Sequence, residues 1–248
     1  MCKVSIIIPT YNERGNIEVV VKRLAESFKG VDYEIVVVDD NSPDGTAEVV
    51  EALSTSYPLR LIKRPARLGL TSAIYDGFKA SRGDYVVVMD ADLQHPPELA
   101  PKLVERLRDC DVVIASRYTR GGRVESWSLV RRVISALAVI ATRLLVPGCS
   151  RIHDPVSGYF ATKREVLENW RPIELRGYKA LVEIIAQAKP SVVCEEPYTF
   201  RGRERGASKL SYRQILSYAR LLVVLGWRRL LIYATGLAII LTLLYIYV

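Results

Sequence analysis

The sequence has 248 residues, with 35 Lys or Arg against 27 Asp or Glu, so the net charge is +8. This length suits one α/β domain with appendages. The basic residues lack the aromatic-interleaved or recognition-helix pattern of a nucleic-acid-binding protein, so nucleic acid is not an expected partner. The cysteines Cys2, Cys110, Cys149 and Cys194 lack metal-ligand spacing and are expected to be reduced packing residues of a cytosolic domain.

The first half of the chain alternates strand-like and helix-like segments. Strands are expected at 4–8, 34–38, 59–63, 85–89 and 112–115, and helices at 16–29, 46–57, 72–80 and 98–108. Strand–helix units repeated at this spacing predict an α/β fold with a mainly parallel sheet and helices on both of its faces. We expect this catalytic domain to occupy 1–211.

Acidic residues follow three of the expected strands. Glu13 follows the first, Asp39 and Asp40 the second, and Asp90 and Asp92 the fourth. The carboxyl ends of parallel strands share one edge of the sheet, where open α/β sheets bind ligands. A cation and a nucleotide would supply partners for these carboxylates. Turn formation and helix capping remain the alternative for one of Asp39 and Asp40, and an exposed first-turn position for Glu13.

The run 86–98, VVVMDADLQHPPE, is the most informative part of the sequence. A fully apolar strand leads directly into Asp90, Asp92 and Gln94, whose oxygen atoms suit a hard cation such as Mg²⁺ or Mn²⁺ shared with phosphates. A solvated acidic turn is the alternative, but the preceding apolar run favours a metal–diphosphate site. Both histidines, His95 and His153, are expected to form structural hydrogen bonds.

Two later segments are amphipathic. The segment 129–147 is strongly apolar, with arginines toward one side, and two interpretations stay open for it: a helix in the membrane interface, or an ordinary core helix. A juxtamembrane amphipathic helix is expected at 212–229. The basic residues concentrated near it fit anionic lipid head groups.

The nineteen residues 230–248 carry no charge and would extend about 28 Å as a helix, close to the thickness of a bilayer. We therefore expect a single C-terminal transmembrane helix. Arg228 and Arg229 precede it directly, and positive residues favour the cytoplasmic side of a span. The catalytic domain is accordingly expected on the cytoplasmic side of the membrane.

Several motifs together resemble the dolichol-phosphate mannose synthases of glycosyltransferase family 2. They are IIIPTYNERGNI, VVVDDNSPDGT, RPARLGLTSAIYDG, MDADLQHPPE, SRYTRGG, WSLVRRVIS, DPVSGYFA and RGRERGASKL, and the resemblance covers residues 3 to about 212. It implies the GT-A nucleotide-diphospho-sugar transferase fold. It also implies inverting transfer of mannose from GDP-mannose to dolichyl (polyprenyl) phosphate, with Mg²⁺ or Mn²⁺, giving dolichyl β-D-mannosyl phosphate and GDP.

The resemblance also implies roles for individual residues. The donor would be bound by Pro9, Tyr11, Glu13, Val38, Asp40, Asp90, Ala91, Asp92, Gln94, Arg203 and Lys209. The metal ligands would be Asp90, Asp92 and Gln94, and the acceptor phosphate would meet Arg117, Arg131 and Ser135. The segment 199–210 would be a mobile acceptor loop that brings Arg203 and Lys209 over the phosphates. Asp92, Arg117, Arg203 and Lys209 would carry the catalysis.

The chemistry is compatible with this set of residues. A lipid monophosphate is already largely ionised at neutral pH, so it needs no protein base. Two other functions remain open from the sequence. One is the same fold with another donor, such as UDP-glucose, and the other is a catalytically silent membrane-anchored module that binds nucleotides or lipids.

Overall fold

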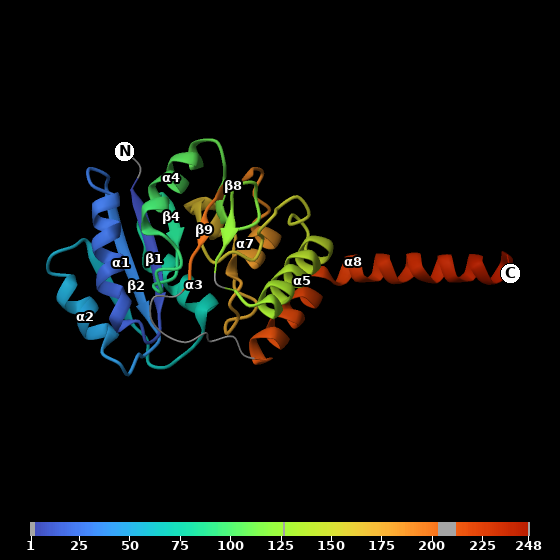
Figure 1. Ribbon diagram of the computed structural model, residues 1–248, viewed down its shortest axis with the longest axis horizontal. Coiled ribbons are helices and arrows are strands. Elements are labelled where there is room, and N and C mark those ends of the chain that lie inside the picture. The colour runs from blue at the N-terminus through green and yellow to red at the C-terminus, as the bar shows by residue number, and fades with distance from the viewer. Residues whose placement is uncertain (1–2, 126, 203–211, 248) are drawn as a thin grey trace.

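The structure, a computed structural model, describes residues 3–125, 127–202 and 212–247 (Figure 1). In the last of these ranges the side chains of 212, 213, 237, 239–241 and 243–247 are not described. An α/β body contains the sheet, and a long C-terminal helix extends away from it (Figure 1).

A seven-stranded sheet forms the centre of the body. Its strands are β1 (Val4–Thr10), β2 (Tyr33–Asp39), β3 (Leu59–Lys63), β4 (Tyr85–Val88), β5 (Val112–Ser116), β7 (Phe160–Lys163) and β8 (Val193–Pro197). They lie in the order β3-β2-β1-β4-β7-β5-β8. All neighbouring pairs are parallel except that β7 runs antiparallel to both β4 and β5. The mainly parallel sheet predicted from the sequence is confirmed, with one reversed strand inside it.

Helices alternate with strands along the first half of the chain, as the sequence predicted. The helices that the structure describes are α1 (Arg14–Ser27), α2 (Thr46–Leu53), α3 (Leu70–Ala80), α4 (Ala100–Glu105), α5 (Leu129–Leu145), α6 (Arg164–Glu168), α7 (Ala180–Ala188) and α8 (Tyr212–Tyr247). Short 3₁₀ turns, Pro97–Leu99 and Arg106–Arg108, flank α4, so the helix expected at 98–108 is divided. A separate small parallel pair joins β6 (Arg123–Val124) to β9 (Thr199–Phe200).

The sheet is buried on both faces. On β1, Ile7 faces a core that includes α3 and α7, while Ile6 and Ile8 face a second core that includes α1 and α4. Continuous apolar strands are typical of parallel sheets covered on both sides. Packing in these two cores holds the sheet in place. It thereby sets the position of the edge at which the parallel strands end.

The helix α5 packs on the core along one side and leaves another apolar side exposed. Its buried residues are Val139 and Thr142, whereas Leu129, Val130 and Leu137 are 77%, 69% and 60% exposed. The start of α8 packs against it, through a hydrogen bond between the hydroxyls of Thr142 and Tyr218. This exposed apolar side does not fit a fully buried helix at 129–147, and a place in the membrane interface stays a prediction.

The described residues of the segments expected as a juxtamembrane helix and a span lie in one continuous helix, α8. Among the residues that the structure describes, no helix is both long enough and apolar enough to cross a bilayer. The expected span at 230–248 includes many side chains that are not described, so the span is not confirmed and stays a prediction.

One expectation about the cysteines is wrong. Cys110 and Cys194 form a disulfide, although 84 positions separate them in the sequence. The parallel pairing of β5 with β8 brings them together, because Cys194 lies opposite Val113. Cys149 is a buried thiol, and burial raises its pKa to about 12, so it fits the packing role expected from the sequence.

Candidate functional site

Three turns at the carboxyl edge of the sheet contain residues with left-handed backbone. Asn12 follows β1, Asn41 follows β2 and Leu93 follows β4, with φ values of 58°, 58° and 62°. Such values are uncommon outside glycine, and they concentrate at ligand-binding sites. The predicted donor-binding residues that the structure describes lie in or next to these turns.

The predicted residues of the first strand lie close to the second. Pro9 is opposite Val38 in the β1–β2 register. Glu13 precedes α1, and its carboxylate accepts a hydrogen bond from the Asn16 amide at 2.9 Å. The guanidinium of Arg67 lies 4.2 Å from the centre of the Tyr11 ring, a cation–π contact. Arg67 was given no role from the sequence, although the motif RPARLGL contains it.

Asp39 takes the structural role that remained open for one residue of the acidic pair. Its carboxylate is fully buried and accepts hydrogen bonds from the Thr10 hydroxyl at 3.0 Å and the Ser42 backbone N–H at 2.8 Å. The hydroxyl of Ser42 donates to it as well, at 2.5 Å. Asp39 therefore fixes the turn after β2.

Asp40 forms a buried ion pair with Arg64, with Oδ1 and Nη1 2.7 Å apart. Burial raises the pKa of Asp40, and the Gly69 N–H and the Arg64 charge oppose that rise. The Gly69 N–H donates to Oδ2 at 3.0 Å. Gly69 has φ +106°, and a Cβ there would lie 2.6 Å from Cα of Arg176. Arg64 is a second site residue that the sequence analysis missed, again within RPARLGL.

The metal-ligand candidates follow β4 directly. Asp92 is buried, and its Oδ1 accepts the Gln94 backbone N–H at 3.2 Å, while 40% of the Asp90 side chain is exposed. Gln94 donates from its amide nitrogen to the Arg201 carbonyl at 2.9 Å, and its amide oxygen is the atom that could ligate a metal. Ala91 is buried between the two aspartates.

These donors fit a hard divalent cation. Within the described part of the chain, no group of three or more His, Cys, Asp and Glu side chains is placed to hold a metal. Two carboxylates and one amide oxygen are instead what Mg²⁺ uses when substrate phosphates and water complete its coordination. The residues Asp90, Asp92 and Gln94 therefore suit a metal that binds together with a diphosphate.

His95 has the structural hydrogen bond expected from the sequence, within the loop that contains the metal-ligand candidates. Its Nδ1 accepts the Asp90 backbone N–H at 3.0 Å, and its ring stacks on Tyr159 with centroids 5.0 Å apart. Burial lowers the pKa of His95 to about 4, with the charge of Asp92 opposing this shift. The imidazole is thus neutral at physiological pH. His153 lies on the surface, with Nδ1 2.7 Å from Oε2 of Glu195.

Arg117 is held by Asp154 through two parallel hydrogen bonds of 2.7 and 2.8 Å from its guanidinium, and a third of 3.0 Å from its backbone N–H. Both side chains are buried. Burial alone would lower the pKa of Arg117, but Asp154 raises it above its usual value. The motif DPVSGYFA contains Asp154, but its sequence alone assigned no role to this residue.

The three predicted acceptor-phosphate residues come together beside this ion pair. The guanidinium groups of Arg117 and Arg131 lie 5.4 and 4.5 Å from the ring of Trp127. Tyr118, which also packs against Arg117, donates from its hydroxyl to the Ser135 hydroxyl at 2.8 Å. A residue after β5 and two residues of α5 thus form one cluster.

Two predicted residues, Arg203 and Lys209, lie outside the described residues, as does most of the loop expected at 199–210. Their proposed roles stay predictions.

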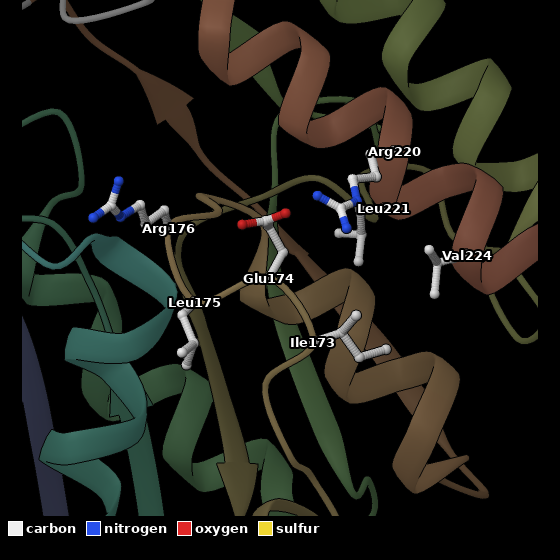
Figure 2. A pocket seen from close by; sticks show the side chains of 7 residues that line it. All are labelled: Ile173, Glu174, Leu175, Arg176, Arg220, Leu221 and Val224. Carbon is white, nitrogen blue, oxygen red and sulfur yellow. The ribbon is translucent and has the colours of Figure 1, made fainter.

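A cavity of about 260 Å³ lies between the loop before α7 and the start of α8 (Figure 2). The described residues that line it are Ile173, Glu174, Leu175, Arg176, Arg220, Leu221 and Val224, and no predicted site residue is among them. The carbonyls of Leu175 and Gly177 in the same loop accept the backbone N–H groups of Ser72 and Thr71 in α3. The loop therefore holds the start of α3 through its backbone.

The chain is similar to known transferases. The model of the family "Glycosyl transferase family 2" matches residues 5–171. A dolichol-phosphate mannosyltransferase of Pyrococcus furiosus is 49% identical over 88% of this chain, and the chain spans 62% of the length of that relative. Enzymes of the same name are 40% identical in Saccharomyces cerevisiae and 36% in Mycosarcoma maydis, where the matches cover 86% and 89% of this chain and 83% and 78% of the relatives.

Solved structures share the fold at lower identity. Glucosyl-3-phosphoglycerate synthase from Mycobacterium tuberculosis, solved with Mn²⁺, UDP-glucose and phosphoglyceric acid, has a TM-score of 0.68 at 21% identity, covering 92% of this chain and 79% of the synthase. Mannosyl-3-phosphoglycerate synthase from Rubrobacter xylanophilus has a TM-score of 0.67 at 20% identity, covering 94% and 75%. These structures confirm the expected GT-A fold. The chain belongs to glycosyl transferase family 2, in the group that contains the dolichol-phosphate mannosyltransferases.

Proposed function

We propose that this protein transfers mannose from GDP-mannose to dolichyl or another polyprenyl phosphate, releasing GDP and forming a β-linked mannosyl phosphate lipid. The observation that carries the proposal is the identity of 36–49% to three dolichol-phosphate mannosyltransferases over 86–89% of the chain. The geometry at the carboxyl edge of the sheet supports it, because potential metal ligands and a cluster of cations meet there.

The donor is proposed to bind along the ends of β1, β2 and β4. Tyr11 and Glu13, with Pro9 and Val38 behind them, would hold the guanosine. The carboxylate of Asp40 would meet the ribose, since Arg64 and Gly69 hold it in a fixed orientation. An ordered carboxylate loses little conformational entropy when a ligand binds.

A divalent cation, Mg²⁺ or Mn²⁺, is proposed to bind Asp90, Asp92 and Gln94 with the diphosphate. Bound there, it would stabilise the negative charge that develops on the β-phosphate as GDP leaves. Arg203 and Lys209 are proposed to add positive charge to the same phosphates. His95, neutral and hydrogen-bonded to the backbone of Asp90, is proposed to orient the loop.

The acceptor phosphate is proposed to bind Arg117, Arg131 and Ser135. Its oxygen would attack the anomeric carbon in line with the departing GDP, which inverts the configuration. Asp154 fixes the Arg117 guanidinium before the substrate arrives, so the cation needs no reorganisation during the reaction. Because the phosphate is already ionised, no side chain has to remove a proton from it.

The lipid is proposed to reach this cluster from the membrane surface. Leu129, Val133 and Leu137 are exposed along α5, the helix that carries Arg131 and Ser135. A helix with such a face lies at the boundary of head groups and acyl chains. We also propose that 230–248 anchors the chain, with Arg228 and Arg229 on the cytoplasmic side.

The test is a transfer assay with the full chain in detergent or lipid vesicles, with dolichyl phosphate and either GDP-mannose or UDP-glucose. We expect a lipid product with GDP-mannose and Mg²⁺ or Mn²⁺, loss of product with EDTA, and loss in Asp92→Asn. The matched control is Asp109→Asn, an exposed aspartate before β5, which should keep the wild-type rate. Metal-independent transfer, or product from UDP-glucose alone, would refute the proposal.

A further inference from the structure

Glu195 lies in β8 and holds the backbone next to Asp154, although the sequence analysis gave it no role. Its carboxylate accepts the backbone N–H groups of His153 and Asp154 at 2.9 Å each, one on each oxygen atom. Asp154 in turn holds the Arg117 guanidinium by hydrogen bonds of 2.7 and 2.8 Å. Two carboxylates therefore lie in series, and the first fixes the backbone from which the second reaches Arg117.

Both carboxylates are shielded from water. The side chain of Glu195 is 11% exposed, and that of Asp154 is fully buried. Hydrogen bonds in such surroundings are costly to leave unmade, so Glu195 restricts the positions that the Asp154 backbone can take. The His153 ring, with Nδ1 2.7 Å from Oε2 of Glu195, adds a more exposed contact to the same carboxylate.

The pairing of β5 with β8 explains why this series of contacts ends at Arg117. The two strands are parallel, with Glu195 opposite Ile114, so Glu195 lies beside the end of β5. Arg117 directly follows Ser116, the last residue of β5. The segment 153–154 is thus held by one strand of the pair, and it holds the residue that follows the other strand. Arg117 is therefore fixed from both strands.

The other neighbours of the guanidinium constrain it less. The rings of Tyr118, Trp127 and Phe200 have their centres 5.3, 5.4 and 5.6 Å from it. Cation–π contacts attract a guanidinium over a range of positions. Two parallel hydrogen bonds to a carboxylate fix its plane as well. A shift of Asp154 would therefore change the direction in which the Arg117 guanidinium points.

We propose that Glu195 is a positioning residue for the acceptor phosphate, because it holds Asp154 where the Arg117 guanidinium is aimed at the phosphate site. This inference rests on the proposed function, which places the acceptor phosphate at Arg117. Charges that are oriented in advance need no reorganisation when the substrate binds and reacts. A change at Glu195 should therefore weaken binding of the acceptor and leave binding of the nucleotide unchanged.

A carboxylate that contributes only to stability is the competing explanation, and the next residue of β8 provides a matched control. Glu196 is also a buried carboxylate, with Oε2 2.7 Å from Nζ of Lys102 and an ion pair to Arg106. Successive side chains of a strand point to opposite faces, so Glu196 meets the segment of α4 while Glu195 meets Asp154. If Glu195 is only structural, both positions should behave alike.

The experiment compares Glu195→Gln with Glu196→Gln. In Glu195→Gln an amino group replaces one oxygen, and it cannot accept the backbone N–H that faces it. We expect this variant to raise the KM for dolichyl phosphate by about tenfold, with the Kd for GDP within about twofold of wild type. Glu196→Gln should keep the acceptor KM within about twofold. Equal acceptor KM values in the two variants, or a Kd for GDP raised as much as the acceptor KM, would overturn the inference.

A double-mutant cycle with Asp154→Asn tests the route of the effect. If Glu195 acts through Asp154, Glu195→Gln should raise the acceptor KM in the wild-type background and have little further effect beside Asp154→Asn. Additive effects would contradict this route and overturn the inference. Where Glu195→Gln does not fold, Glu195→Asp replaces it, since its carboxylate keeps the charge but is one carbon shorter. An acceptor KM unchanged in Glu195→Asp would also overturn the inference.

Titration with farnesyl phosphate, a soluble isoprenyl phosphate, gives a readout that is independent of turnover. Weaker binding in Glu195→Gln than in Glu196→Gln supports the inference, and equal binding overturns it. If the wild-type protein binds farnesyl phosphate but makes no mannosyl lipid, the proposed function fails, while the titration still decides the role of Glu195. If transfer occurs and both variants bind the acceptor alike, the inference alone fails. A wild-type protein that neither binds farnesyl phosphate nor makes the product would overturn both.

Discussion

Asp154 holds Arg117 by three hydrogen bonds of 2.7, 2.8 and 3.0 Å, although the two residues lie 37 positions apart in the sequence. Replacement of the carboxylate by an amide in Asp154→Asn leaves a buried guanidinium without its counter-charge. Because a buried charge without a partner is costly, we expect the free energy of unfolding to fall by about 3 kcal/mol. Urea denaturation measures this change.

The same substitution should raise the KM for the acceptor, since the Arg117 guanidinium is no longer fixed. Glu18→Gln is the control, because Glu18 forms an exposed pair with Lys22 one helical turn away, and such pairs contribute less than about 0.5 kcal/mol. Equal stability of Asp154→Asn and Glu18→Gln would contradict the importance given to the buried pair.

Gly69→Ala should damage the donor side of the site. At φ +106° and ψ 160°, Gly69 occupies a region that is almost restricted to glycine, and a new Cβ would lie 2.6 Å from Cα of Arg176. We expect the free energy of unfolding to fall by about 3 kcal/mol or more. We also expect a higher Kd for GDP, because the Gly69 N–H would no longer donate its hydrogen bond to Asp40.

Gly30→Ala is the matched control for this strain. Gly30 also has a positive φ, +82°, but no atom lies within 4 Å of the position that a new Cβ would take. This variant should lose only about 1–2 kcal/mol and bind GDP normally. If both variants bound GDP equally well, the link between Gly69 and the donor site would be wrong.

The stability of the protein should depend on pH through His95. Its pKa is about 4 in the folded protein, below the ordinary value of 6.5, because burial disfavours the charged form. The unfolded chain therefore takes up a proton at higher pH than the folded protein does. The contribution of His95 to the free energy of unfolding is therefore fully present above pH 6.5. It falls by about 3 kcal/mol in total as the pH drops toward 4.

Urea denaturation between pH 5 and pH 7 measures this effect before most carboxylates titrate. His95→Gln, which cannot take up the proton, should show a smaller change in unfolding free energy across the same range. If wild type and His95→Gln had the same pH dependence, His95 would not be the buried neutral residue described above.

Reduction of the disulfide between Cys110 and Cys194 should lower stability without lowering transfer activity. The bridge closes a long loop, so its loss should cost about 2–4 kcal/mol. Cys110 precedes β5, whereas Arg117 follows its opposite end, so the site is at a distance from the bridge. Thermal unfolding with and without a reductant measures the effect.

The double variant of Cys110→Ser and Cys194→Ser should be insensitive to reductant, and Cys149→Ala should keep the wild-type sensitivity, because its thiol is not bridged. If reduction leaves the melting temperature of the wild-type protein unchanged, the disulfide does not contribute to stability.

Local sequence patterns predicted where several of the candidate residues lie in the fold. The apolar strand before Asp90 and Asp92 was sufficient to place both at the carboxyl edge, because a parallel strand ends where the ligand binds. The convergence of Arg117 with Arg131 and Ser135 was expected from the family resemblance, and the structure brings them together around Trp127 and Tyr118.

Other features depend on pairings between distant segments and were not predicted. Asp154 contacts Arg117 from the segment that leads into β7, which inserts antiparallel between β4 and β5, and nothing in the local pattern of 160–163 indicates the direction of that strand. The disulfide depends in the same way on the register of β5 with β8. Long-range topology, rather than local propensity, decided these positions.

The most direct test of the proposed reaction is the structure of the lipid product. The full chain would be incubated with GDP-mannose labelled with ¹³C at the anomeric carbon, dolichyl phosphate and Mg²⁺, and the product examined by mass spectrometry and NMR. We expect one mannose linked through phosphate to the lipid, in the β configuration. An α-linked product, or mannose released to water with the lipid phosphate unchanged, would contradict the proposed transfer.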